Sequence, residues 1–341
     1  MSLDISINTI FKILAVLLGL WFVFMIRDVI AIIFASLIVA SALSPTIDKL
    51  AKRGLPRVVT ILVTYLLLIA FVGVLVYFIL PPAITQLRQL ADQLPTYFNY
   101  FQNLISNLRD FGVQNHLISG SQAGLNTVSD FLNNFTSNIF NTTKGFISNF
   151  TAVLTVFVLT LYLLLDENGI KNFFVALLPV KQKNQIVNIA RKVGAGLGAW
   201  LRGQILLGII VGVMVYIGLS IIGVPYALTL ALLAGALEII PIIGPILSAI
   251  PAILIALSIS PTMALIVTVF YILVQELENK LLVPKVMQRT VGLHPVTIII
   301  VLLVGAKLMG VLGILLAVPV TSVIYIILKE WSSLSKPARS K

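Results

Sequence analysis

The chain has 341 residues, of which 59% are hydrophobic and only 10% are charged. Soluble domains carry about 25% charged residues, so this composition excludes an ordinary soluble fold. The net charge of +11 does not indicate nucleic acid, because the basic residues lie at the ends of long apolar runs and form no stripe with interleaved aromatics. Cysteine is absent, which excludes disulfides and thiolate metal sites. The apolar runs predict an all-α polytopic membrane protein in a lipid bilayer.

The N-terminal region, residues 1–81, is predicted to hold membrane spans at 8–26, 29–44 and 58–80. No small-residue cleavage site follows the first apolar run, so we expect a retained span rather than a signal peptide. The segment 45–57 is rich in lysine and arginine, and the positive-inside rule therefore places it in the cytoplasm.

Residues 82–149 are more polar and carry no net charge. Their apolar positions recur in steps of three and four, which predicts amphipathic helices too polar to span a membrane. We expect a helical extracytoplasmic insert on or near the membrane surface. It could be a plain helical hairpin packed on its own fold, an oligomer contact, or a lid over a transport pathway.

Residues 150–328 are expected to form a transport region. A span at 150–165 leads inward, an amphipathic helix begins near residue 182, and a span at 204–222 leads outward. The apolar run 227–260 follows, and its halves of about 14 and 15 residues are shorter than the roughly 20 that an upright span needs. A re-entrant hairpin and two spans fit this run equally well.

A span at 262–282 is predicted to return to the cytoplasm, and a second broken apolar run occupies 296–328. The tail at 329–341 is basic, so we expect both termini in the cytoplasm and the protein in the cell membrane. The prediction is about six full spans plus two broken or re-entrant hairpins, about eight membrane segments in all. The hairpins would open to opposite sides, which resembles an inverted arrangement around a midplane site.

Glu238 is the only charged residue between Arg202 and Glu276. A carboxylate in hydrocarbon costs roughly 2.5–3.5 kcal/mol on insertion scales. The apolar run around it is interrupted by residues that break helices and free backbone carbonyls: Pro241, Gly244 and Pro245. A buried acid beside broken backbone predicts a transport site where a proton or a cation is bound. The alternative is a protonated or paired structural glutamate.

A second polar group lies near the inner end of the 262–282 span. Glu276 and Lys280 are four residues apart and could pair on one helix face. The alternative is a solvated helix end, although apolar residues continue beyond the group. Its candidate site residues are Gln275, Glu276, Glu278 and Asn279.

Two basic residues are further candidates. Arg202 could line the pathway or anchor a helix by snorkelling to the interface, and we favour the anchor. Lys307 lies in the break of the second hairpin and could snorkel or bind an anionic group. His294 at the start of that hairpin is more typical of a structural role.

No enzyme motif is present in the sequence. There is no phosphate-cradling glycine loop, no HExxH pair and no GxSxG elbow. We therefore expect no enzymatic activity, no cofactor and no metal site, and the chain alone cannot be an ATP-driven pump.

The chain resembles the autoinducer-2 exporter family of bacterial and archaeal membrane proteins over nearly its whole length. No single motif identifies the family, but the combination and order of the matching motifs are specific to it. The matching motifs are PTIDKLAKRGLPR at 45–57, LYLLLD at 161–166, GAWLRGQ at 198–204, GVPYALTLALLAGALEIIPIIGP at 223–245, QELENKLLVPKVMQRTVGLHPV at 275–296 and GAKLMGVLGILLAVPV at 305–320.

The resemblance implies secondary transport. Some family members are assigned export of autoinducer-2, a small polyhydroxylated quorum-sensing signal, and others sodium(lithium)/proton antiport. Homo-oligomers, pentamers among them, are described for the family. Carried over, the resemblance points to Glu238 with the segment that follows it and to Glu278 with Asn279. The family commonly has an aromatic residue after Pro241, where this chain has Ile242, which weakens the expectation that a sugar-like ligand stacks there.

The sequence therefore predicts a secondary exporter of a small polar organic solute, with proton coupling through Glu238 as the simplest driving mechanism. A sodium/proton antiporter is the alternative within the same class. A non-transporting membrane scaffold, supported by the large insert, is a third hypothesis. A buried acid in a broken helix argues against the scaffold because it is an expensive feature for such a role.

Overall fold

The computed structural model describes residues 7–70, 151–166, 183–287 and 294–334, together with isolated positions between 73 and 96. Every element in this part of the chain is helical, which confirms the predicted all-α class. The insert expected at 82–149 lies, apart from isolated positions, outside the described residues.

Four of the described helical segments are long and apolar enough to cross a membrane. Shorter apolar helices lie between them, among them Arg57–Ala70 and Thr151–Leu165. The predicted total of about eight membrane segments stays a prediction. The four segments are Arg27–Ala51, Lys183–Ile222, Pro261–Val286 and Val296–Glu330.

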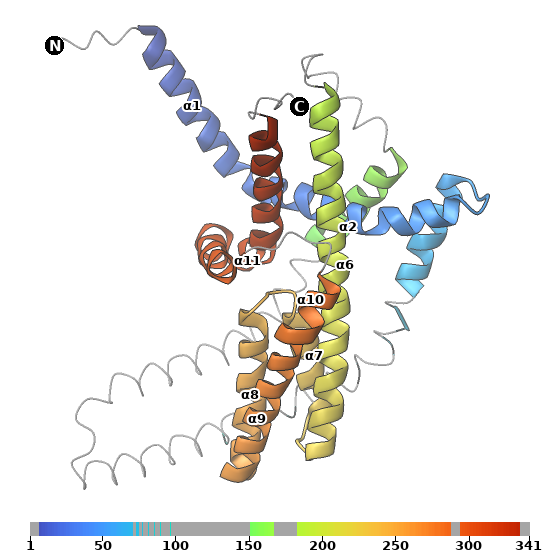
Figure 1. Cartoon of the computed structure of the whole chain (residues 1–341), viewed down its shortest axis with the longest axis vertical. Helices are drawn as coiled ribbons and strands as arrows, with labels where there is room; N and C mark the ends of the chain where they lie inside the picture. Colours follow the sequence, from blue (N-terminus) through green and yellow to red (C-terminus); the bar gives the residue numbers. More distant parts are fainter. Residues whose placement is uncertain are drawn as a thin grey trace, which may run out of the picture.

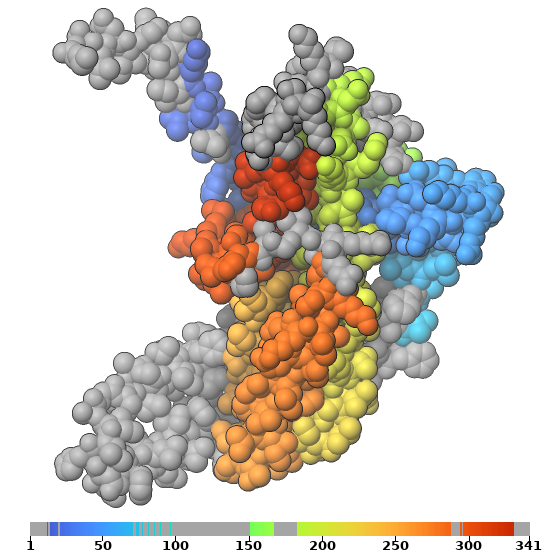
Figure 2. Space-filling view, viewed as in Figure 1, coloured from blue at the N-terminus to red at the C-terminus, as the bar shows by residue number. Residues whose placement is uncertain are grey.

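The N-terminal pair consists of α1 (Ile7–Met25) and α2 (Arg27–Ala51). In the space-filling view, α1 projects away from the main body of the molecule (Figure 2). The sequence prediction ended the second span at residue 44 and treated 45–57 as a loop, but α2 continues through Pro45 to Ala51. The first half of the expected loop is therefore helical.

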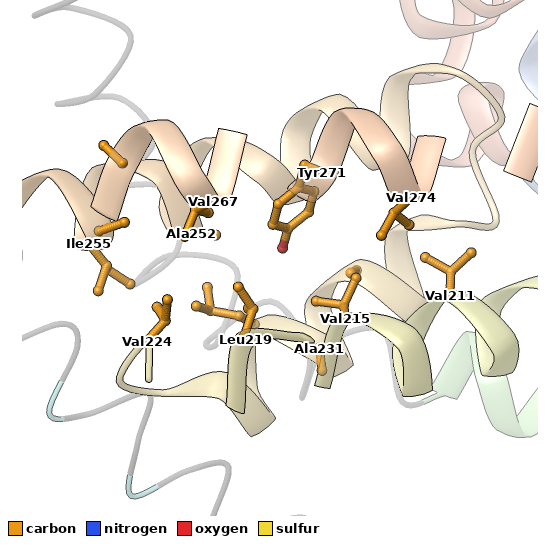
Figure 3. Close-up of a cluster of buried hydrophobic side chains, with 14 residues drawn as sticks. Val211, Val215, Leu219, Val224, Ala231, Ala252, Ile255, Val267, Tyr271 and Val274 are labelled. Carbon is orange, nitrogen blue, oxygen red and sulfur yellow. The ribbon is translucent and has the colours of Figure 1, made fainter. Parts of the chain in front are cut away.

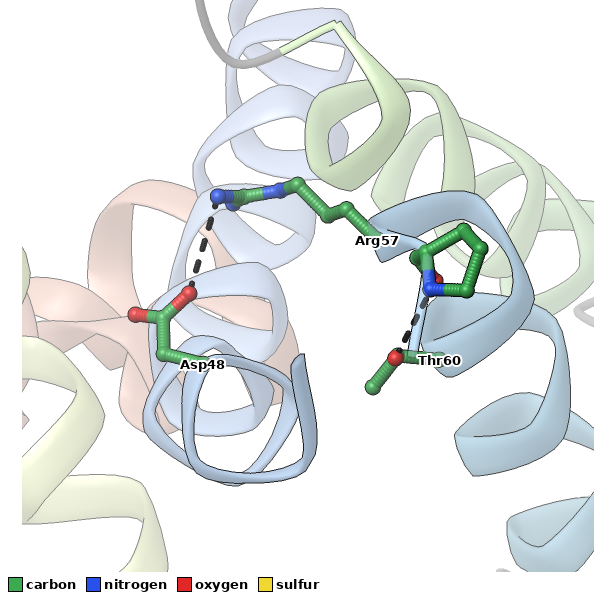
Figure 4. A network of polar contacts seen from close by, with 4 residues as sticks. Asp48, Arg57 and Thr60 are labelled. Atoms are coloured by element: carbon green, nitrogen blue, oxygen red, sulfur yellow. Dashed lines mark hydrogen bonds and ion pairs between the residues drawn. The ribbon is translucent and has the colours of Figure 1, made fainter. Parts of the chain in front are cut away.

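A short turn follows α2 and connects it to the helix Arg57–Ala70. Gly54 has a φ of 94°, a value that favours glycine. Arg57 reaches back across the turn to Asp48, with 3.6 Å between the guanidinium nitrogen and the carboxylate oxygen (Figure 4). In the first turn of the new helix, the Thr60 hydroxyl donates to the Pro56 carbonyl at 3.2 Å. The ion pair links the two helix ends at the surface, where such pairs contribute little to stability.

The longest continuous element, α6 (Lys183–Ile222), runs through the centre of the structure (Figure 1). The predicted amphipathic helix near residue 182 and the span at 204–222 are thus one helix of 40 residues. Gly198 of α6 packs directly on the carbonyl group of Ser41 in α2, in space that a side chain would occupy. This glycine is where α2 and α6 make their close approach.

The run 227–260 forms two short helices, α7 (Ala227–Leu237) and α8 (Ile243–Ile259). The predicted break is confirmed, but it lies at residues 238–242, so Gly244 and Pro245 belong to the first turn of α8. Proline is tolerated there because first-turn N–H groups have no partner within the helix.

α8 and α9 (Pro261–Leu277) form a helical hairpin, in which the Ser260 hydroxyl caps α9 by accepting from the Met263 N–H at 3.0 Å (Figure 1). A single π-helical turn, η2 (Glu278–Leu282), and the short α10 (Val283–Val286) follow α9. The helical path from α9 therefore continues to Val286 with one irregular turn near its C-terminal end.

The largest apolar core lies among α6, α7, α8 and α9 (Figure 3). Val215 and Leu219 of α6 face Ile255 of α8 and Val267 of α9, and all of these side chains are fully buried. A second cluster joins α2, α6, the 239–243 segment and α11. Outside these clusters, many large apolar side chains of the spanning helices are exposed, as expected for surfaces that face lipid.

The last element, α11 (Pro295–Leu334), bends at Met309 and Gly310, whose backbone angles are not helical. Its two halves run in clearly different directions in Figure 1. Gly305 and Gly313 touch each other through their backbones at the bend. The predicted break at 307–310 is thus confirmed at its C-terminal end, while Lys307 itself is helical.

Candidate functional site

Two buried glutamates meet where α7 and α9 end. Glu238 follows the last residue of α7 and is 1% exposed, and Glu278 begins the π-helical turn and is 4% exposed. Their carboxyl groups lie within hydrogen-bonding contact of each other. The sequence analysis identified both residues but treated them as separate groups. The structure brings them into one site, which we call the acid pair.

Two glutamine side chains surround the acid pair. Gln204 of α6 is 4% exposed, and its amide group donates to the backbone carbonyl of Glu238. Gln275 of α9 donates to the carboxylate of Glu278 at 3.3 Å. Gln275 was a predicted site residue, whereas Gln204 was not. The signal for Gln204 was available, because it is a polar residue within the apolar run that follows Arg202.

Gln204 reaches Glu238 because α6 and α7 approach unusually closely. A Cβ atom on Gly208 would lie 2.6 Å from the carbonyl oxygen of Gly235, and one on Gly235 would lie 2.7 Å from that of Gly208. Real side chains do not tolerate such distances, so glycine is required at both positions. Gly208 lies one helical turn after Gln204, and this contact therefore sets the distance between α6 and the acid pair.

The backbone before α8 is strained beside Glu238. Ile242 has φ 70° and ψ −52°, and the Ile243 N–H donates to the Pro241 carbonyl at 2.8 Å. These features define a γ-turn of the rare, strained form, and positive φ is exceptional for a β-branched residue. Gly244 then packs against the Leu237 carbonyl, in space that a side chain would fill. The predicted residues Pro241 and Gly244 thus build the turn that brings α8 back against the end of α7.

The backbone is also irregular on the other side of the acid pair. The π-helical turn begins at Glu278, and such turns are rare and occur frequently at functional sites. Glu278 is buried, whereas Asn279 is exposed. Gln275 thus shares the buried side of the helix with Glu278, to which it donates, and not with the exposed Asn279.

The remaining predicted residues lie outside this group. Glu276 and Lys280 form the predicted i, i+4 ion pair, and both are exposed. Lys307 is also exposed, on the first half of α11. Pro245 is buried in the first turn of α8.

Arg202 connects helices instead of meeting the acids. Its guanidinium group donates to the carbonyls of Ser41 at 3.3 Å and Ala42 at 2.8 Å. The Ser41 carbonyl would normally accept from the backbone N–H of residue 45, but residue 45 is proline and has none. Arg202 supplies the missing donor, so its role in the structure is that of an anchor between α6 and α2.

The acid pair can bind positive charge. Two buried carboxylates in contact repel each other, so the pair is stable only when it holds a proton or a cation. One carboxylate oxygen of Glu238 is buried and has no hydrogen-bond partner among the described residues. Carboxylate and amide oxygens suit hard cations. The described residues contain no cluster of three or more His, Cys, Asp or Glu side chains that could hold a metal ion.

Buried acids at interrupted membrane helices are typical of secondary transporters. The comparison with known families agrees, because the model described as AI-2E family transporter matches residues 10–333. The chain belongs to the AI-2E transporter family and is a multi-pass membrane protein.

Several named proteins are similar to the chain over most of their length. YrrI of Bacillus subtilis (strain 168), described as a candidate transport protein, is 30% identical over 91% of this chain and 89% of its own. YueF of the same organism, described in the same way, is 31% identical over 81% of this chain and 77% of its own. A protein of Halobacillus andaensis named sodium-lithium/proton antiporter is 26% identical over 88% of this chain and 90% of its own.

Proposed function

We propose that the chain is a secondary transporter that couples proton movement to the movement of a second solute at the acid pair. The contact between the buried carboxyl groups of Glu238 and Glu278 carries this proposal. A site that must hold positive charge can exchange a proton for a cation, because either one removes one negative charge from the pair and so relieves the repulsion between the two carboxylates. Exchange of protons for a small alkali cation is the function that this donor set supports best.

Two further observations support cation exchange. The site offers carboxylate oxygens, which small hard cations prefer, and Glu238 has a buried oxygen free of other bonds in the described part of the chain. The relative from Halobacillus andaensis carries the name sodium-lithium/proton antiporter.

Export of a small polar organic solute such as autoinducer-2 is the second candidate. The family description supports it, and the amide groups of Gln204 and Gln275 could hydrogen-bond a polyhydroxylated molecule. In this case the acid pair would carry the driving proton.

We place the protein in the cell membrane with both termini in the cytoplasm, on the basis of the basic segments at 45–57 and 329–341. The family resemblance supports a homo-oligomer, with a pentamer as the proposed state.

Purified protein in liposomes with an imposed pH gradient tests the proposal. Addition of Na⁺ or Li⁺ should collapse the gradient across wild-type liposomes, as followed by a pH-sensitive dye. Glu238→Gln and Glu278→Gln should abolish the response, because each removes one carboxyl group from the pair. Glu276→Gln is the matched control, since Glu276 is exposed and two residues from Glu278, and it should retain the response.

The same liposomes distinguish the two candidates. A collapse that requires autoinducer-2 and ignores Na⁺ and Li⁺ would favour solute export. Full activity of Glu238→Gln with either substrate would refute the acid pair as the coupling site.

A further inference from the structure

The side chain of Tyr271 is an unexplained polar group in the largest apolar core. Tyr271 lies on α9 and is 8% exposed, and its buried hydroxyl has no hydrogen-bond partner among the described residues. Figure 3 shows the hydroxyl pointing from α9 toward the side of the core that carries Val215 and Leu219. An unsatisfied buried hydroxyl costs about 1–3 kcal/mol. Phenylalanine would fill the same space without this cost, so packing alone does not explain the tyrosine.

Tyr271 lies on the same face of α9 as the acid pair. The buried positions of this helix recur in steps of three and four, which places them on one face. Tyr271 and Glu278 are seven residues apart, about 10 Å along the helix axis. The positions on this face are Ala264, Val267, Tyr271, Val274 and Glu278.

A second buried hydroxyl lies at the level of Tyr271. Because α8 and α9 form a hairpin around Ser260, residues at equal distances from Ser260 lie at similar heights. Ser248 of α8 is therefore level with the turn that contains Tyr271. Its side chain is 1% exposed and donates to the Pro245 carbonyl at 2.9 Å. Each helix of the hairpin thus carries one buried hydroxyl group between the acid pair and Ser260.

Among the described residues of this core, no charged group packs against Tyr271. Its described neighbours in the core are apolar on α6, α7 and α8, with Val211, Ala231 and Ala252 as examples (Figure 3). Toward the C-terminal end of α9, the nearest buried ionisable group is Glu278, which begins the following turn. A proton that moves from the acid pair toward the Ser260 end therefore meets Tyr271 as its next ionisable group.

We propose that Tyr271 is a relay residue for protons that move between the acid pair and the Ser260 end of the α8–α9 hairpin. This inference rests on the proposed function. In the relay, the hydroxyl oxygen accepts a proton from a hydronium ion on one side, which becomes water, while its own O–H proton passes to a water molecule on the other, which becomes hydronium. Rotation of the hydroxyl then restores the starting state, so the tyrosine carries no net charge and no covalent bond to carbon changes. The relay requires water to enter the separation of about 10 Å between Tyr271 and Glu278, and the Tyr271 hydroxyl, which has no other partner among the described residues, would hydrogen-bond that water.

Tyr271→Phe tests the relay because it removes only the hydroxyl. Tyr216→Phe is the matched control, since Tyr216 is an exposed tyrosine on α6. Each variant is reconstituted in liposomes, and the initial rate of proton movement and the Na⁺ concentration for half-maximal rate are measured. Thermal unfolding in detergent is measured in parallel.

Tyr271→Phe should slow proton movement by about tenfold or more. The half-maximal Na⁺ concentration should stay unchanged, because the acid pair is intact, and thermal stability should be equal to that of wild type or higher. Tyr216→Phe should behave as wild type in all three measurements.

Three outcomes would overturn the relay. Equal rates for Tyr271→Phe and wild type would show that the hydroxyl is not on the path. A slow rate accompanied by a lower melting temperature would show that the hydroxyl is structural. If wild-type protein moves no protons with any cation or with autoinducer-2, the proposed function fails first and the relay fails with it.

Discussion

Replacing Gly208 by alanine should push α6 and α7 apart beside the acid pair. The new Cβ atom would lie 2.6 Å from the Gly235 carbonyl oxygen, whereas ordinary contacts begin at 3.4 Å. The obstacle is backbone and not the end of a flexible side chain, so the two helices must separate by about 0.8 Å to restore a normal contact.

The free-energy cost follows from this displacement. Overpacking of this kind costs about 1–3 kcal/mol, and the higher helix propensity of alanine offsets at most about 1 kcal/mol. Separation of the helices would also stretch the hydrogen bond from Gln204 to the Glu238 carbonyl, which adds about 1 kcal/mol. We expect a net loss of about 1–3 kcal/mol for Gly208→Ala.

A graded series of glycine variants gives the control. A Cβ atom on Gly212, on the same α6–α7 contact, would lie 3.3 Å from the Ala231 carbonyl oxygen, and one on Gly19 of α1 would meet nothing within 4 Å. Thermal unfolding in detergent should therefore rank Gly208→Ala clearly below Gly212→Ala, and Gly212→Ala at or slightly below Gly19→Ala. Each kcal/mol corresponds to about 2 °C.

Transport should follow the same order, because Gln204 positions the backbone of Glu238. The reasoning is refuted if Gly208→Ala unfolds at the same temperature as Gly19→Ala. A result in which Gly212→Ala is the more damaging of the two core variants would equally contradict it.

Two further predictions concern the hydrogen bond from Arg202 to the Ser41 carbonyl and the γ-turn at Ile242. Arg202→Met should lower stability by about 1–3 kcal/mol. The loss should be smaller in a Pro45→Ala background, because residue 45 then regains an N–H for the Ser41 carbonyl. Thermal unfolding of wild type, both single variants and the double variant measures this coupling, and strictly additive losses would argue against it. Ile242→Gly should be more stable than the neighbouring control Ile243→Gly by about 2 kcal/mol, because only the first relieves strain at positive φ; equal melting temperatures would show that the γ-turn is not strained.

Much of the helical architecture could be predicted from the sequence, because long apolar runs indicate membrane helices. The break after Glu238 was predictable from Pro241 and Gly244, and the pair of Glu276 and Lys280 from their spacing of four. The position of the break was predicted less well. Proline in the first turn of α8 is compatible with helix, so Pro245 marks the start of a helix and not an interruption.

The extension of α2 beyond residue 44 depends on a contact that the sequence does not reveal. Pro45 removes one backbone donor and would ordinarily mark the end of a helix. Arg202, which is distant in sequence, replaces that donor at the Ser41 carbonyl. Such compensation is tertiary, and no local pattern around Pro45 indicates it.

The assembly of the acid pair was beyond sequence reasoning for a related reason. Each glutamate is visible as an unusual charge, but only the packing of α7 against α6 and of α8 against α9 decides that they meet. The π-helical turn at Glu278 also has no clear sequence signature. The burial of Glu278, by contrast, follows from its place on the buried face of α9, four residues after Val274, while Asn279 is exposed.

The α8–α9 hairpin has irregular backbone at both of its open ends. The γ-turn at Ile242 precedes α8, and the π-helical turn that begins at Glu278 follows α9. One acid of the pair lies just before the first irregular segment, and the other lies within the second. A tilt of the hairpin as a rigid unit would therefore alter the spacing between the two carboxyl groups directly. The affinity of the pair for positive charge would then depend on the orientation of the hairpin. An alternating-access cycle requires such coupling between the occupancy of the ion site and the conformation of the protein.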